Sequence, residues 1–228
     1  MKNVIVSVDL RPKFGPARDQ GARPTCLAFA TSDAHAAARS NWSQLSCEYL
    51  FYCAQKRDGR SPYVGATLQA TLDAIRHDGQ PNESGWPYLK CVPTDLGLWK
   101  PPSDVGALYG RNGEPAASGI NEIIISLTRR QPVVLLLKLS HSFFAPTPDA
   151  IVDLQRGETP EPAQRHAVIA VGHGIARRQK AVLVRNSWGL AWGDAGHVWL
   201  TQRFLAASLF ATAILKEEVD VSAGSTTA

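Results

Sequence analysis

The order in which helical and extended patterns follow one another constrains the fold of this chain most strongly. Patterns with helical spacing come first and predict helices at Cys26 to about Ser40, Ser46 to Gln55, Thr67 to His77 and Asn121 to Arg130. Apolar runs come later and predict strands over 133–139, 166–172, 181–185 and 197–201. Helices that precede strands favour an α+β fold over the alternation of a parallel α/β sheet.

The stretches between these patterns give weaker expectations. Residues 1–25 contain repeated Gly and Pro and are expected to be irregular, and residues 80–118 are expected to form loops. Residues 216–228 end in AGSTTA and are expected to form a flexible tail. The chain has 228 residues, which suits one domain or two closely packed subdomains.

Composition excludes several classes of protein. Apolar residues make up 44% and charged residues 19% of the chain, which is a globular balance and not that of a disordered protein. The net charge of +4 comes without a long basic run, so no nucleic-acid partner is expected. The longest apolar stretch, Ala206 to Leu215, is far shorter than the roughly 20 residues that cross a membrane. The N-terminus lacks a signal-peptide pattern, so we expect a cytoplasmic protein or one exported without a cleaved signal.

The four cysteines offer no metal site by spacing. Cys26, Cys47, Cys53 and Cys91 form no C-x-x-C pair and have no neighbouring His pair, which argues against zinc. Four cysteines allow three complete pairings, and their spacing does not choose among them.

Cys26 is the first candidate for chemistry, because a sulfur at a helix start is favoured as a thiolate. Gln20 precedes it across a Gly- and Pro-containing turn, where its amide could donate to an oxyanion. His166 opens one predicted strand and Asn186 closes the next, so the amide could orient the imidazole while Trp188 covers their bond. Taken singly, each of these residues is more often structural than catalytic.

Taken together, these segments resemble the papain-like cysteine peptidases. DQGARPTCLAF resembles the family's Q-G-x-C-G-S-C-W-A-F segment, and HAVIAVGHG resembles its histidine strand. VRNSWGLAWGDAGHVWL is similar to N-S-W-G-x-x-W-G-x-x-G-Y and is the most specific match. LSCEYLFYCA and GWPY also resemble family segments, and all the motifs occur in family order.

The resemblance implies a role for each of these residues. Cys26 would be the nucleophile, His166 its ion-pair partner and proton donor, Asn186 the residue that orients His166, and Gln20 the oxyanion donor. It also implies a cleft between a helical subdomain, about 20–105, and a β-rich subdomain, about 106–215 plus the N-terminal segment. No metal or organic cofactor is needed, and the substrate would be a polypeptide.

The resemblance also implies a set of substrate contacts. Gly65 and Ala66 would hold the substrate backbone, while Gln164, Arg165, Ala167 and Trp188 would lie beside the catalytic residues. A helix-initiating turn is the alternative for Gly65 and Ala66. Because Arg23 and Arg165 each adjoin a catalytic segment, we hypothesise a cationic rim that favours acidic or polar substrate residues; two solvated arginines are the alternative.

Several positions depart from the family pattern. Arg23 stands where the family has a cysteine, Leu27 follows the nucleophile in place of Trp, and Cys47 replaces a Glu. Cys53 and Cys91 match a family pair, so the resemblance allows a disulfide between them, with two ordinary thiols as the alternative. The catalytic segment begins too early for the family's inhibitory pro-segment, so the resemblance implies either an excised domain or another restraint, such as an inhibitory or delivery partner.

Three functions are compatible with this reading. The first is a cysteine endopeptidase that hydrolyses peptide bonds through a thioester. The second is a thiol acyltransferase or deamidase on a protein substrate, which would use the same thioester. The third is a non-catalytic module that uses the cleft to bind peptides. The joint presence of all four candidate catalytic residues argues against this third function.

Overall fold

The structure is a computed structural model and describes residues 4–221. Among these residues, eight strands form one sheet in the order β2-β8-β3-β5-β6-β7-β4, with β1 paired to β5. The strands are β1 (Val4–Asp9), β2 (Gly110–Ala116), β3 (Val133–Lys138), β4 (Ile151–Val152), β5 (Arg165–Ala176), β6 (Gln179–Arg185), β7 (His197–Thr201) and β8 (Leu209–Val219). All neighbouring strands run antiparallel except β4 and β7, which are parallel.

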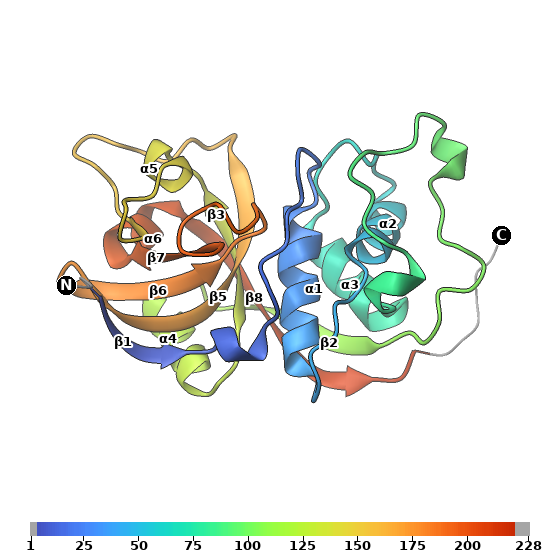
Figure 1. The fold of residues 1–228 in the computed structure, drawn as a ribbon, viewed down its shortest axis with the longest axis horizontal. Coiled ribbons are helices and arrows are strands. Elements are labelled where there is room, and N and C mark those ends of the chain that lie inside the picture. Colours follow the sequence, from blue (N-terminus) through green and yellow to red (C-terminus); the bar gives the residue numbers. More distant parts are fainter. Residues whose placement is uncertain (1–3, 222–228) are drawn as a thin grey trace.

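Helices lie on both sides of the strand-rich half of the molecule. They are α1 (Cys26–Ala38), α2 (Cys47–Asp58), α3 (Leu68–His77), α4 (Ile120–Thr128), α5 (His141–Phe144) and α6 (Gln202–Ser208). Figure 1 shows α1, α2 and α3 in one half and most of the sheet with α4, α5 and α6 in the other. The three longest helices of the described residues thus lie apart from most of the sheet (Figure 1), in agreement with the expected α+β class.

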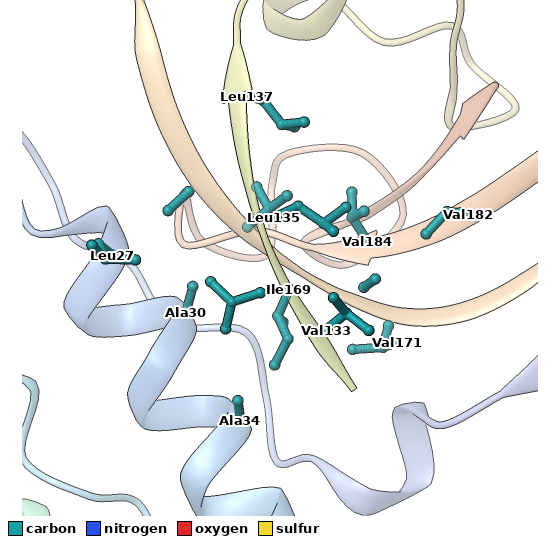
Figure 2. Close-up of a cluster of buried hydrophobic side chains, with 14 of the residues drawn as sticks. Leu27, Ala30, Ala34, Val133, Leu135, Leu137, Ile169, Val171, Val182 and Val184 are labelled. Carbon is teal, nitrogen blue, oxygen red and sulfur yellow. The ribbon is translucent and has the colours of Figure 1, made fainter. Parts of the chain in front are cut away.

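The helix α1 forms the boundary between these two halves. Every residue from Leu27 to Ala37 is buried, so the helix is covered on all sides. Figure 2 shows Leu27, Ala30 and Ala34 on the side that faces the sheet, opposite Val133 and Ile169. Alanine side chains let the helix approach the strands closely, and Cys26 is thereby carried to Ala167 on the central strand β5.

Four strands of the described residues appear where the sequence predicted none: β1, β2, β4 and β8. Val4–Asp9, expected to be irregular, forms β1 on the edge of β5. Gly110–Ala116, expected to be a loop, forms β2 against β8. The second segment contains two Gly and one Pro, so its own propensity is low and its extended form depends on the pairing with β8.

The expected flexible tail from residue 216 is wrong in its first part. The strand β8 continues to Val219, where the chain pairs with Gly110 of β2. The polar residues of this segment did not suggest a regular structure. The pairing with β2 holds the segment in its extended form. Residues 222–228 of the expected tail lie outside the described residues.

Over residues 4–221, no helix combines the length and the apolar character that crossing a bilayer requires.

Candidate active site

Cys26 is the first residue of α1 and is half-buried. Its sulfur lies near the backbone N–H groups of Cys26, Leu27 and Ala167, all of which favour the thiolate. Ala167 directly follows His166 on β5, so this contact brings the start of the helix to the histidine strand. The segment before the helix is fixed by Tyr88, whose hydroxyl donates to the Gln20 carbonyl at 2.7 Å and lies 2.9 Å from Thr25 Oγ1.

His166 and Asn186 are joined as the sequence predicted. His166 Nε2 lies 2.6 Å from Asn186 Oδ1, and both residues are buried. The same Oδ1 accepts from the Ser187 N–H at 2.8 Å, which identifies it as the amide oxygen. His166 Nε2 therefore donates, and in the neutral ring Nδ1 carries the lone pair that can accept a proton.

Aromatic side chains surround this pair. The Trp188 ring centroid lies 4.7 Å from that of His166, and Phe143 lies 5.9 Å from the same imidazole. Trp188 also packs on Phe144 and Trp192, with centroid distances of 5.5 and 5.6 Å. These rings keep water from the His166–Asn186 bond, as expected for Trp188.

Both the oxygen and the nitrogen of the Gln20 side-chain amide form hydrogen bonds within the protein. Its Oε1 accepts from Ser187 Oγ at 2.6 Å, and its Nε2 donates to the Arg23 carbonyl at 2.8 Å. The Gln20 backbone N–H also donates to the Ser187 carbonyl at 2.9 Å. Ser187 therefore fixes the orientation of the amide, so that the second N–H of Nε2 is left for an oxyanion.

Burial opposes ionisation of both reacting groups. It raises the pKa of the Cys26 thiol despite the three backbone N–H groups, which lower it. It lowers the pKa of His166 to about 4, and the Asn186 bond offsets only part of this shift. Both shifts favour the uncharged forms of the isolated groups, and the thiolate–imidazolium pair implied by the sequence stays a prediction.

The candidate residues line one cleft of about 770 Å³. Gln20, Cys26, His166 and Trp188 lie along it. So do the expected substrate contacts Gly65, Ala66, Gln164, Arg165 and Ala167. Asn186 does not line it and lies behind His166.

Arg23 does not supply the cationic rim that the sequence suggested. Its guanidinium is buried and donates to both oxygens of Glu48, at 2.5 and 2.9 Å. The same carboxylate accepts from Trp99 Nε1 at 2.7 Å and from the Leu89 N–H at 3.0 Å. The charge of Arg23 is thus neutralised within the protein, because an unpaired buried cation would be costly. Arg165 is exposed and lines the cleft as expected.

The disulfide between Cys53 and Cys91 is not formed. All four cysteines lie within the described residues and are free thiols. Cys53 lies on α2, where burial and the nearby Asp78 carboxylate raise the pKa of its thiol, while Cys91 is exposed. A buried protonated thiol is a stable, unreactive state for Cys53.

An ion-pair network ties α1 to β6, the strand that ends at Arg185, directly before Asn186. Asp33 on α1 accepts from Arg18 Nη2 and from Arg185 Nε, each at 2.7 Å. Arg185 also donates to the carbonyls of Gly15 and Pro16 at 2.7 and 2.6 Å. All three charged side chains are largely buried. Arg185 immediately precedes Asn186, so the network sets the position of Asn186 relative to the helix that carries Cys26.

Sequence reasoning missed several residues that shape the site. These are Ser187, Tyr88, Glu48, Asp33, Arg60 and Phe210. Ser187 and Tyr88 lay inside matched motifs, Ser187 next to Asn186 and Tyr88 as the last residue of GWPY, so the motifs were an available signal. The pairing of Asp33 with Arg185 spans 152 residues and left no local pattern.

Within residues 4–221, no group of three or more His, Cys, Asp or Glu side chains is arranged to hold a metal ion.

Comparison with known proteins identifies the family. A family model described as papain family cysteine protease matches residues 5–213. Thiol protease aleurain of Arabidopsis thaliana is 27% identical over 186 residues, which cover 80% of this chain and 51% of aleurain. Chymopapain of Carica papaya is 26% identical over 211 residues, which cover 88% of this chain and 56% of chymopapain. The chain thus spans somewhat more than half the length of these curated relatives.

Solved structures agree on the fold. The crystal structure of xylellain, a cysteine protease from Xylella fastidiosa, matches with a TM-score of 0.74 and 22% identity. The match covers 93% of this chain and 87% of that structure. This likeness confirms the predicted papain-like α+β fold. The family model covers most of the chain, and the chain belongs to the papain family of cysteine proteases.

Proposed function

We propose that this protein is a cysteine peptidase that hydrolyses peptide bonds with Cys26 as nucleophile. The observation that carries the proposal is the 2.6 Å bond from His166 Nε2 to Asn186 Oδ1, which leaves Nδ1 as the base in the cleft that Cys26 lines. The named relatives aleurain and chymopapain support peptidase chemistry for the family. The geometry supports the roles proposed for the individual residues.

The reaction would proceed in two steps. The Cys26 proton passes to His166 Nδ1 while the sulfur adds to the peptide carbonyl carbon, and Gln20 Nε2 with the Cys26 N–H receives the oxyanion. The C–N bond breaks, Nδ1 returns the proton to the leaving amine, and a thioester remains. Water then adds to the thioester with Nδ1 as base, and the released sulfur regains its proton.

The mass of the products tests the proposal against the thioester alternatives. The protein is incubated with an unfolded protein substrate, with and without a thiol alkylator, and the products are weighed by mass spectrometry. We expect new, shorter chains whose masses sum to the substrate plus water, and none after alkylation. An intact chain that has gained a small mass or a new adduct would replace hydrolysis by deamidation or acyl transfer.

The pH dependence of activity follows from the two pKa shifts. The active pair holds one proton, so the acid limb of kcat/KM marks entry of a second proton on His166, whose lowered pKa is about 4. Activity should therefore persist well below the ordinary histidine value of 6.5. The alkaline limb should lie above the ordinary thiol value of 9.0, because the pKa of Cys26 is raised.

A matched variant tests the cause of the acid limb. The Asn186 bond raises the pKa of His166, so Asn186→Ala should move the acid limb still lower while kcat falls. Steady-state kinetics across the acid range measure both effects, with circular dichroism to show that the fold persists. An acid limb near the ordinary histidine value in the unaltered protein would contradict this account.

We propose that the cleft prefers acidic substrate residues. Arg60 and Arg165 are exposed and line it, and no Asp or Glu is among the described residues along it. The Arg165 guanidinium lies over the Phe210 ring, 5.5 Å from its centroid, and this contact holds the charge beside an apolar wall. A carboxylate side chain bound there would meet only positive charge.

Charge reversal at Arg165 tests this preference. We expect Arg165→Glu to reduce the ratio of kcat/KM for a glutamate peptide over its lysine counterpart by about tenfold or more. The ratio cancels any effect on the neighbouring His166, because both substrates use the same catalytic residues. Arg178→Glu removes an equal charge from an exposed turn outside the cleft and should leave the ratio unchanged. Peptide-library cleavage without acidic enrichment would refute the preference.

A further inference from the structure

A second recess lies at the other end of α1 from the candidate cleft. We call it the rear groove, and it encloses about 920 Å³. The C-terminal residues Ala34, Ala37 and Ala38 of α1 line the rear groove, whereas Cys26 at the N-terminus of the helix lines the cleft. A helix of 13 residues spans about 20 Å, so a ligand in this recess would not touch the candidate nucleophile.

Segments from distant parts of the sequence build the rear groove. The turn after β1, the end of α1, the connection from α4 to β3, and β8 all contribute to its walls. Figure 1 shows these segments converging below α1, where the two halves of the molecule meet. A partner seated here would contact both halves at once.

The charge of the rear groove is uniform in sign. Five cationic side chains line it: Lys13, Arg39, Arg129, Arg130 and Lys216. No Asp or Glu is among the described residues that form its walls. Such clustering of one sign raises the local concentration of oppositely charged ligands.

Most of this charge is not neutralised by the protein itself. Lys216 pairs with Glu114 at 2.6 Å, but among the described residues no carboxylate lies within ion-pair distance of Arg129 or Arg130, and both are exposed. Lys13 Nζ reaches only the Arg130 carbonyl, at 3.5 Å. Arg39 lies over the Tyr109 ring, and its Nη1 is buried without a hydrogen-bond partner among the described residues.

The rest of the lining favours a polypeptide over a nucleic acid. Ala34, Ala37 and Leu215 give the rear groove an apolar part that suits aliphatic side chains. Its one aromatic ring, Trp42, already packs on Phe14 with a centroid distance of 5.6 Å. That ring is not free to serve as the stacking platform on which single-stranded nucleic acids depend.

We propose that the rear groove binds an acidic segment of a partner protein whose carboxylates alternate with apolar side chains. The partner would be held by Arg129, Arg130 and Lys13, away from the cleft. Binding there would recruit a substrate or a regulator without occupying the site of hydrolysis. Because the proposal rests on the charge and shape of this surface, it holds whether or not the protein is a peptidase.

A peptide-binding experiment tests the proposal. The probe is a fluorescent peptide of alternating Glu and Leu, titrated with the Cys26→Ala protein so that the probe is not cut. A Gln–Leu peptide of equal length and a single-stranded oligonucleotide serve as comparison ligands. We expect salt-sensitive binding of the Glu–Leu peptide, weak or no binding of the Gln–Leu peptide, and weaker binding of the oligonucleotide.

Matched charge reversals locate the binding site. Arg129→Glu with Arg130→Glu should weaken peptide binding by about tenfold or more. Arg177→Glu with Arg178→Glu makes the same change in net charge on another exposed turn, outside the rear groove, and should change affinity less than about twofold. If the first pair impairs folding, Lys13→Glu repeats the test from the turn after β1.

Three results would overturn the proposal. They are absence of peptide binding, equal weakening by both pairs of reversals, and oligonucleotide binding that is tighter than peptide binding and depends on Arg129 and Arg130. The first would show that the charge attracts no acidic peptide, and the second that any attraction is non-specific. The third would assign the rear groove to nucleic acid.

Discussion

Replacing Cys26 by alanine is expected to lower kcat for peptide hydrolysis at least about a thousandfold, because no other thiol lines the cleft among the described residues. The fold should survive, since the side chain is half-buried and the change removes only the sulfur. Substrate binding should persist, because the other cleft residues are untouched. Hydrolysis of a fluorogenic peptide and equilibrium binding of the same peptide measure the two effects.

The exposed Cys91 provides the matched control for this experiment. It is another free thiol but does not line the cleft, so Cys91→Ser should keep full activity. Alkylation should still inactivate that variant, which assigns the loss of activity to Cys26 and not to a surface thiol. If the Cys26→Ala protein cleaved peptide at the unaltered rate, the proposed mechanism would be abandoned.

Removal of the Asp33 carboxylate is expected to have the second large effect, a fall in the free energy of unfolding. Asp33→Ala leaves Arg18 and Arg185 as two buried cations without their shared carboxylate, and breaking such a pair costs about 3–5 kcal/mol. Urea unfolding near neutral pH, followed by tryptophan fluorescence, measures the free energy of unfolding. Asp33→Asn preserves the size of the side chain, so a loss in that variant as well isolates the charge from the volume.

A more exposed ion pair, between Arg57 and Asp78, provides the comparison for the stability loss expected at Asp33. Asp78 accepts two hydrogen bonds from Arg57, at 2.7 and 2.8 Å, but both side chains are about one-third exposed. Asp78→Ala should therefore cost under about 1 kcal/mol. Equal losses for the Asp33 and Asp78 variants would show that burial does not strengthen the Asp33 network.

The sequence correctly predicted those helices and strands whose own residues favour that secondary structure. The helix α1 contains neither Gly nor Pro from Cys26 to Ala38, and β3 and β5 have continuous apolar runs, so each was found within a few residues of its bounds. β2 was missed because its Gly and Pro residues do not favour a strand, and its pairing with β8 lies about a hundred residues away. Such pairings are decided by the assembled sheet and not by local propensity.

The candidate site likewise has a part that the sequence predicted and a part that it did not. Cys26, His166 and Asn186 lie in motifs that are legible from the sequence, and the structure brings Asn186 to His166 and places Cys26 and His166 along one cleft. The surroundings of Arg23 were not legible, because its charge is neutralised by Glu48 on α2, whose carboxylate also accepts from Trp99 in a later loop. The directions of the pKa shifts at Cys26 and His166 were not legible either, since they depend on the depth of burial.

The contact between Arg23 and Glu48 bears on how the protein tolerates reducing conditions. The turn that leads to Cys26 is fastened to α2 by charge and hydrogen bonds, and all four cysteines are free. A thiol reagent such as dithiothreitol, which keeps Cys26 reduced, finds no disulfide to open in this molecule. Conditions that keep the Cys26 thiol reduced therefore do not weaken the structure around it.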